Sequence, residues 1–230
     1  MTRRIAVELM LLLAAIALAF ALRLYVFGIY QIPSESMVPR LLAGDIVLVD
    51  KRHFSRGTTL PARGDIIVFH APPRGKVDYV KRVIGLPGDS VALRDGVVIL
   101  NGQPLPRRRI PDLVLPGPHC PMPLERRPDG SLACRYYRYV ETMPDGTSHV
   151  LLDIGLTEGD DYGPVRVPPG RLFLMGDNRD LSADSRLPAG VRGGIGLVPA
   201  STVVGRARMI LFSFDSMDQS VRWSRTGMRF

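Results

Sequence analysis

Lysine is scarce in this sequence of 230 residues: among 30 lysines and arginines, only Lys51, Lys76 and Lys81 are lysines. Histidine is also rare, and none of its four residues lies in a catalytic-triad or HExxH context. Cys120 and Cys134, the two cysteines, do not have the ligand spacing of a zinc site. We therefore expect neither a metal nor a cofactor, and a hydrolase of this composition needs a base other than histidine.

Long apolar runs are absent after the first 24 residues, which excludes a multi-span transporter. Ile5–Leu22 contains one charged residue, Glu8, and as a helix it would span roughly 27 Å, close to the thickness of a bilayer core. We predict a cytoplasmic flank at residues 1–4 and a transmembrane anchor at residues 5–24, with the remaining chain outside the cytoplasm. A cleaved secretory signal is the alternative, because Ala19-Phe20-Ala21 resembles a cleavage site.

The extracytoplasmic compartment bears on the cysteines and on the net charge of +8. Oxidising surroundings favour a disulfide between Cys120 and Cys134, worth about 3 kcal/mol for a loop of this length, and two free thiols are the alternative. The basic run Arg107-Arg108-Arg109 has no aromatic platform beside it, so we expect a solvated or lipid-facing loop and no nucleic acid.

The rest of the chain is typical of β structure. Short β-branched runs alternate with turn sequences rich in the 23 glycines and 20 prolines. We predict a mostly β fold, an antiparallel sheet domain built from residues 25–103 and 150–230, with a looser Pro-rich and β-hairpin subregion inserted at residues 104–149. The predicted strands and hairpins cover residues 45–49, 65–69, 79–84, 90–100, 135–142, 149–154, 171–175 and 203–214.

Two hydroxyl side chains, Ser34 and Ser36, lie between Pro33 and Pro39 directly after the apolar segment. In an extended segment, residues two apart face the same side. A serine-rich linker between anchor and domain is the alternative interpretation.

Lys81 lies at a strand position in a chain that otherwise uses arginine. Arginine would serve equally well on the surface, but only lysine can be made neutral by burial. A second polar segment, Gly176–Arg186, holds three aspartates, two arginines and two serines after an apolar strand. By itself this segment could also be a surface loop of satisfied turns.

Four segments in this order, taken together, resemble a known family: Pro33–Met37, Arg63–Asp65, Tyr79–Asp89 and Gly176–Arg186. They are similar to the four characteristic boxes of bacterial type I signal peptidases (leader peptidases, family S26). These are membrane-bound Ser/Lys endopeptidases that remove signal peptides, and the likeness covers nearly the whole chain. Leu181 and Arg40 depart from the usual Asn and Thr of that pattern.

The resemblance implies a role for each matching residue. Ser36 would be the nucleophile and Lys81 the neutral general base, and the Ser36 N–H and the Ser34 hydroxyl would form the oxyanion hole. Ser182 would hydrogen-bond and orient Lys81. The supporting ion pairs would come from Asp184, Arg186, Arg82 and Asp177, and the substrate pockets would be lined by Ile32, Tyr79 and Val80.

The resemblance also implies a partner and a location. We expect a monomer in the plasma membrane, with the lipid bilayer and the signal peptides of exported preproteins as partners and cleavage after Ala-x-Ala. Two alternatives stay open. One is a Ser/Lys maturation protease dedicated to a conjugation or pilus substrate, and the other is a non-catalytic, membrane-anchored binding domain.

Overall fold

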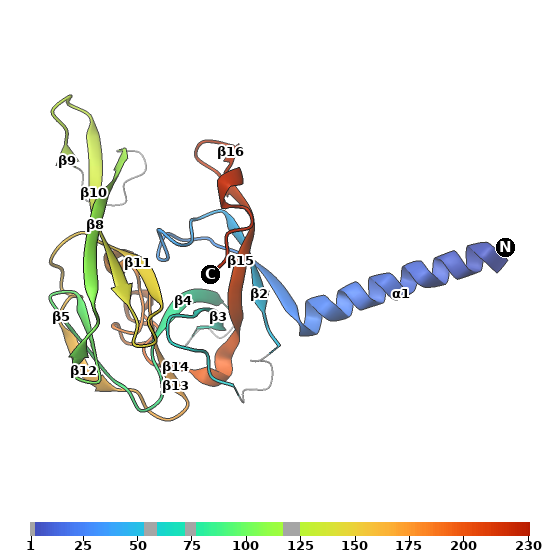
Figure 1. Ribbon diagram of the computed structural model, residues 1–230, viewed down its shortest axis with the longest axis horizontal. Helices are drawn as coiled ribbons and strands as arrows, with labels where there is room; N and C mark the ends of the chain where they lie inside the picture. Colours follow the sequence, from blue (N-terminus) through green and yellow to red (C-terminus); the bar gives the residue numbers. More distant parts are fainter. Residues whose placement is uncertain (1–2, 53–58, 72–76, 117–124) are drawn as a thin grey trace.

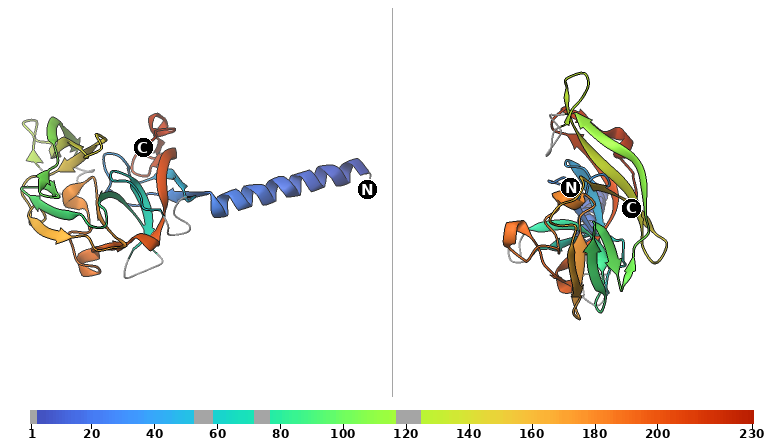
Figure 2. Two further views of the ribbon diagram at one scale, coloured as in Figure 1. Left: turned by 60° about the horizontal axis from the view of Figure 1, so that its bottom comes forward. Right: turned by 90° about the vertical axis from the view of Figure 1, so that its left-hand side faces the viewer.

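The computed structural model describes residues 3–52, 59–71, 77–116 and 125–230, without the side chains of residues 3, 18–25 and 116. Helix α1 (Arg3–Tyr25) projects away from a body made of β-strands (Figures 1 and 2). Within this part of the chain, no helix is both long and apolar enough to cross a membrane. The N-terminal segment is thus a helix, as predicted, but the prediction that it crosses the membrane is not confirmed.

The main sheet carries the central part of the fold, and the predicted mostly β architecture is confirmed. All ladder pairings between its strands are antiparallel, and the sheet curls so that both faces pack against other elements. Its strand order is β1 (Phe27–Gln31), β2 (Asp45–Asp50), β15 (Val203–Asp215), β3 (Ile66–His70), β4 (Asp78–Gly85), β13 (Arg171–Met175) and β14 (Val198–Pro199), with β16 (Ser220–Val221) paired to β15.

Two smaller antiparallel sheets flank the main sheet. The second sheet lies on the side of the body opposite to α1 (Figure 1) and consists of β11 (Ser148–Asp153), β10 (Leu132–Thr142) and β8 (Arg107–Pro116), with β9 (Glu125–Arg126) paired to β10. The third sheet consists of β12 (Tyr162–Arg166), β5 (Ser90–Arg94), β6 (Val97–Leu100) and β7 (Gln103–Pro104). Short 3-10 helices complete the described elements: η2 (Arg179–Leu181), η3 (Val191–Gly193), η4 (Ala200–Thr202) and η5 (Trp223–Arg225). The proposed division of the chain at residues 104 and 149 stays a prediction.

The hairpin predicted at residues 90–100 is confirmed, together with the two turns that flank β6. Asp95 and Gly96 have φ of 47° and 73°, and Asn101 and Gly102 have φ of 53° and 80°. Both pairs lie in the left-handed region that two-residue hairpin turns of type I′ require. Asn and Asp tolerate this region better than most side chains, and glycine enters it without steric cost.

The arginine run at residues 107–109 corrects the prediction of a loop, because it begins strand β8. Arg107 forms an ion pair with Asp153 (2.9 Å), and its guanidinium lies 3.6 Å from the centroid of the Tyr139 ring. Arg109 lies over Tyr137 on the same partner strand. Contacts with tyrosines and a carboxylate of neighbouring strands thus stabilise this segment as a strand, although its sequence shows no alternation of apolar and polar residues.

Strands β3 and β4 lie in the middle of the main sheet and have a core on each side. Ile67 and Phe69 pack on one face with Leu172 and Leu174 of β13 and nearby segments. Their neighbours Ile66 and Val68 pack on the other face against the loop that precedes β2. Lys81 and the rest of β4 up to Gly85 are therefore buried, whereas Asp78 at the start of the strand is exposed.

Candidate active site

Ser36 lies in the loop between β1 and β2, in a turn that the main sheet holds in place. Hydrogen bonds from the Ile32 N–H to the Asp45 carbonyl (2.8 Å) and from the Gly44 N–H to the Ile32 carbonyl (2.9 Å) fix its start. Met37, buried in the adjacent core, fixes the residue after the serine. Ser36 itself is only 8% exposed. The linker interpretation of this segment is wrong, because the segment is packed into the sheet.

Lys81 approaches this serine from strand β4. Its side chain is 3% exposed, and Nζ donates a hydrogen bond of 2.6 Å to Ser36 Oγ. The two residues are 45 positions apart in the sequence, so the tertiary fold alone makes this contact. The geometry is that of a nucleophile and a base within proton-transfer distance.

Burial lowers the pKa of Lys81 from 10.5 to about 8. The carboxylates of Asp184 and Asp177 oppose this change because they favour the ammonium, and Arg186 adds to it. Desolvation dominates, as expected for an amine in a protein interior. A useful fraction of Lys81 is therefore neutral near physiological pH and has a lone pair that can accept a proton.

Two donors lie close to the Ser36 oxygen. Ser34 Oγ is 3.3 Å from Ser36 Oγ, and Ser34 is exposed at the protein surface. The backbone N–H of Ser36 has no acceptor among the residues that the structure describes. An N–H and a hydroxyl beside a nucleophile are the groups from which oxyanion holes are built.

The segment after β13 packs directly against the Ser36 loop. A Cβ on Gly176 would lie 2.4 Å from both the Ser36 carbonyl oxygen and Ser182 Oγ, so only glycine allows this approach. The Gly176 N–H donates to Asp184 Oδ2 (3.2 Å), and Asp184 forms a buried ion pair with Arg186 (2.9 Å). Burial favours protonation of Asp184, but Arg186, Lys81 and the Gly176 N–H together outweigh it and hold the pKa of that carboxyl below its usual range. The interpretation of this segment as a surface loop is therefore wrong.

A second ion pair braces the other side of the site. Arg82 follows Lys81 on β4 and binds Asp177 with two hydrogen bonds of 2.6 Å, and both side chains are buried. Arg82 also donates to the Gly64 carbonyl (2.6 Å), which ties the turn before β3 to the same cluster. Bidentate pairing of this kind fixes the relative orientation of two elements.

Ser182 differs from its predicted role. Its Oγ is buried and has no hydrogen-bond partner among the described residues, so the expected hydrogen bond to Lys81 is not formed. Lys81 donates to Ser36 instead. Ser182 does lie at the site, because its Oγ is one of the atoms nearest to Gly176, next to the Ser36 carbonyl.

Asn178 contacts the nucleophile loop and was missed from the sequence. Its N–H donates to the Ser36 carbonyl (3.1 Å), and its Nδ2 donates to the Glu35 carbonyl (3.3 Å). The adjoining Asp177 carbonyl accepts a hydrogen bond from Leu152 of β11 (2.8 Å), which joins the second sheet to this loop. The signal was present, since Asn178 lies inside the polar segment, but backbone-directed contacts leave no distinctive spacing in a sequence.

The residues predicted to line substrate pockets separate into two groups. Ile32 and Val80 pack in the same apolar cluster. Tyr79 packs against Phe69 in the cluster on the other side, with ring centroids 6.2 Å apart. Because side chains alternate along a strand, Tyr79 shares its face of β4 with Lys81.

Two further predictions concern cysteines and metals. Cys134 is buried on β10, but Cys120 lies outside the described residues, so the disulfide stays a prediction. In the described part of the chain, no group of three or more His, Cys, Asp or Glu side chains is placed to hold a metal ion.

A family model described as "Signal peptidase, peptidase S26" matches residues 5–212 of this chain. The chain belongs to the S26 signal peptidase family. It is therefore a serine endopeptidase of the signal-peptidase type, and the resemblance found in its sequence is confirmed.

Curated relatives agree with this assignment. Signal peptidase I of Bacillus caldolyticus is 34% identical over 192 residues, covering 84% of this chain and 83% of the relative. Signal peptidase I of Rickettsia typhi is 29% identical over 223 residues, covering 86% and 76%. The crystal structure of a signal peptidase I from Enterococcus faecalis is 26% identical, with a TM-score of 0.34, and covers 64% of this chain and 97% of that chain.

Proposed function

We propose that this S26 peptidase cleaves signal peptides from exported preproteins with Ser36 as nucleophile and Lys81 as general base. The observation that carries the proposal is the hydrogen bond of 2.6 Å between Lys81 Nζ and Ser36 Oγ, made by an amine whose pKa burial lowers to about 8. Hydroxyl activation by a neutral amine requires both the short distance and the lowered pKa.

The reaction follows from these positions. Neutral Lys81 accepts the proton of the Ser36 hydroxyl as the oxygen attacks the scissile carbonyl, and the Ser36 N–H and Ser34 Oγ donate to the developing oxyanion. The ammonium then gives its proton to the leaving amine, and an acyl-enzyme ester on Ser36 remains. Lys81, neutral again, takes a proton from the water that attacks this ester and passes it to the Ser36 oxygen as the ester bond breaks, which restores the hydroxyl and the neutral amine. Each oxyanion donor is expected to be worth about 10² to 10³ in rate.

The surrounding groups support the pair. Asp184 with Arg186 and Asp177 with Arg82 hold the loop after β13 against the nucleophile, and the two carboxylates keep the pKa of Lys81 from falling further.

The substrate is proposed to lie extended beside the Ile32 and Tyr79–Val80 segments, adding a strand whose alternate side chains are read. Small pockets at these residues would favour alanine at the −1 and −3 positions. A panel of Ala-x-Ala substrates cleaved at similar rates would support a general signal peptidase. Cleavage of a single pilus or conjugation substrate would support the dedicated alternative.

We propose in addition that α1 attaches the catalytic domain to the plasma membrane from the extracytoplasmic side, with the N-terminus in the cytoplasm. The support is its row of solvent-exposed apolar side chains, among them Met10, Leu11, Leu12, Leu13 and Ile16. Single apolar residues are common on surfaces, but a continuous helix of them is costly in water. Alkaline carbonate extraction distinguishes a membrane-integrated chain, which stays in the pellet, from a chain whose segment is cleaved or lies on the surface.

Cleavage of a model preprotein by wild type and by Ser36→Ala tests the central proposal, with the N-terminus of the product sequenced. We expect Ser36→Ala to be inactive. Ser34→Ala is the matched control, because it removes a hydroxyl 3.3 Å away and should keep a residual rate, lower by about 10² to 10³. Full activity of Ser36→Ala would overturn the assignment, and inactivity of the wild type on every preprotein would favour the non-catalytic alternative.

A further inference from the structure

A cavity lies on the side of β4 away from Lys81. This cavity has a volume of about 700 Å³ and is bordered by the main sheet, by β10 and β11 of the second sheet and by the last residues of the chain. Arg82 lines it, whereas neither Ser36 nor Lys81 does. Because consecutive strand residues point to opposite faces, the cavity and the catalytic amine lie on different sides of the same strand.

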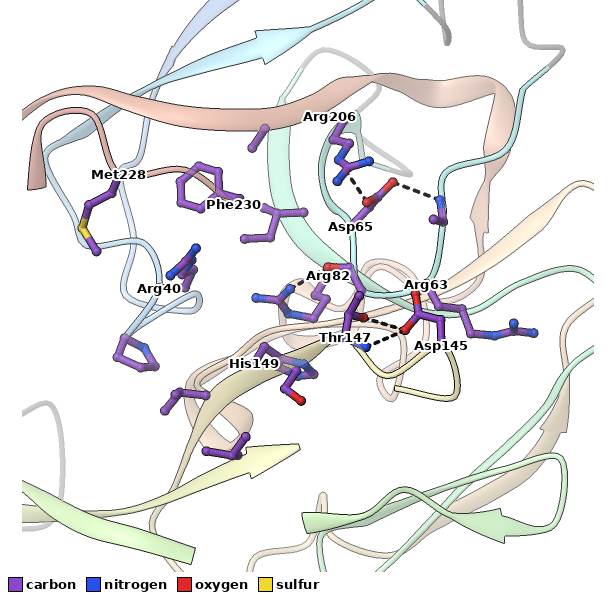
Figure 3. A pocket seen from close by; sticks show the side chains of 18 of the residues that line it. Arg40, Arg63, Asp65, Arg82, Asp145, Thr147, His149, Arg206, Met228 and Phe230 are labelled. Atoms are coloured by element: carbon purple, nitrogen blue, oxygen red, sulfur yellow. Dashed lines mark hydrogen bonds and ion pairs between the residues drawn. The ribbon is translucent and has the colours of Figure 1, made fainter. Parts of the chain in front are cut away.

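The cavity is rich in guanidinium groups, and Figure 3 shows several of them facing the same space. Among the side chains of the described lining residues, the carboxylates are those of Asp65 and Asp145. Asp65 pairs with Arg206 (3.0 Å), and Asp145 accepts two hydrogen bonds within its own turn, from Thr147. The arginines in the lining are Arg40, Arg63, Arg82, Arg138 and Arg206.

Three of these arginines have carboxylate partners, and two do not. Arg63 pairs with Asp89 (2.6 Å), Arg82 with Asp177 and Arg206 with Asp65. In the described part of the chain no carboxylate lies within ion-pair distance of Arg40 or Arg138.

The described hydrogen bonds and ring contact of these two guanidinium groups are made with neutral groups. Arg40 donates to the Arg229 carbonyl and lies 5.1 Å from the centroid of the Phe230 ring. Arg138 donates to the Pro111 carbonyl (2.6 Å). Burial and the nearby Arg82 lower the pKa of Arg40, and Asp177 only partly opposes them. Excess positive charge therefore remains at the cavity, and an anion there would be stabilised.

The shape of the site favours a phosphoryl group over a carboxylate. One bidentate guanidinium satisfies a planar carboxylate, whereas the tetrahedral oxygens of a phosphoryl group accept donors that arrive from several directions. Here the unpaired donors come from separate elements, the loop before β2 and strand β10. The lining also includes the apolar side chains of Ile66, Ala207, Met228 and Phe230, of which Phe230 lies against Arg40. These can contact an uncharged group attached to the phosphate.

We propose that this cavity binds a phosphoryl oxyanion carried on a partly apolar group, held by Arg40 and Arg138. Two sources have this chemistry, a soluble phosphate ester and the headgroup of an anionic phospholipid. The proposal does not depend on the catalytic assignment, since neither Ser36 nor Lys81 lines the cavity.

Binding to the full chain in neutral detergent tests the proposal by isothermal titration calorimetry. One arm titrates glycerol 3-phosphate. The other compares mixed micelles that contain phosphatidylglycerol with micelles that contain phosphatidylcholine. Binding of the ester alone identifies a soluble ligand, and binding of phosphatidylglycerol micelles alone identifies a lipid headgroup. Binding in neither arm overturns the proposal.

Charge-neutral variants decide whether the named residues are responsible. Arg40→Gln and Arg138→Gln should each weaken binding about tenfold, the loss expected for one charge-assisted hydrogen bond. Arg192→Gln is the control, because it removes the same charge from the exposed 3-10 helix η3, which does not line the cavity. Unchanged affinity in both cavity variants, or an equal loss in the control, would refute the assignment. Because one folded cavity variant suffices, failure of the other to fold leaves the test intact.

Discussion

Acidification should switch off hydrolysis in a way that reports the pKa of Lys81. If the neutral amine is the base, kcat/KM follows the fraction of enzyme in which Lys81 has lost its proton. With the pKa at about 8, that fraction is roughly one-tenth at pH 7 and roughly one-hundredth at pH 6. An amine at its ordinary pKa of 10.5 would be neutral about 300-fold less often at pH 7. Burial of Lys81 is thus worth more than two orders of magnitude in rate.

The assay is cleavage of a fluorogenic Ala-x-Ala peptide by detergent-solubilised enzyme between pH 5.5 and pH 10, at constant ionic strength. The peptide should contain no group that titrates in this range. We expect the logarithm of kcat/KM to rise with a slope near one and to level off above pH 8. Circular dichroism at each pH confirms that the enzyme stays folded.

Two results would refute this reasoning. A profile that is flat from pH 6 to pH 9 would show that Lys81 is not the base. A value of kcat/KM that still rises with a slope near one up to pH 10 would show that burial does not lower the pKa of the amine from 10.5. Asp177→Asn gives a check on the sign, because removal of a carboxylate that favours the ammonium must move the midpoint to lower pH, and a shift to higher pH would contradict the electrostatic account.

Three substitutions test other parts of the site. Lys81→Met should abolish cleavage and stabilise the fold at pH 7 by up to roughly 3 kcal/mol, because the lowered pKa of Lys81 makes the wild type lose stability as the pH falls from 10.5 to 8. Thermal unfolding should show a smaller stability difference between variant and wild type at pH 10 than at pH 7, and an equal difference at both pH values would contradict this account. Gly176→Ala places a Cβ 2.4 Å from the Ser36 carbonyl and should destabilise the fold by about 1 to 3 kcal/mol as well as lower kcat; wild-type kinetics would refute the close approach. Asn178→Ala removes the hydrogen bond to Glu35 and should lower kcat about 2- to 10-fold with little change in KM, whereas a rise in KM alone would indicate a role in substrate binding.

Local chemistry explains which parts of the fold the sequence predicts well. The hairpin at Asp95-Gly96 and the strands around Lys81 depend on turn residues and β-branched runs, and both were predicted with accurate bounds. Strand β8 depends instead on pairing between Arg107 and Asp153 and on tyrosines of β10, which are remote in the sequence. Its prolines and arginines therefore indicated a loop.

The same distinction applies to the site. Ser36 and Lys81 were found because the resemblance to a family assigns a role to each position. The hydroxyl of Ser182 was expected on Lys81, but the direction of a side chain depends on packing that a sequence pattern does not encode. Asn178 acts largely through backbone groups, and the arginine cavity gathers residues from distant segments, so neither leaves a periodic or spaced signal.

The hydrogen bond from Leu152 to the Asp177 carbonyl has a consequence for protein engineering. It makes β11 a structural neighbour of the nucleophile loop, and a second contact, from the Ile154 N–H to Asp180 Oδ2 (2.8 Å), strengthens the connection. The exposed turn at residues 127–130, between β9 and β10, lies at the opposite end of the same sheet from these contacts (Figure 1). An epitope for cryo-EM labelling or a crystallisation tag belongs in that turn, whereas shortening the sheet from its β11 end would dismantle the support of the serine.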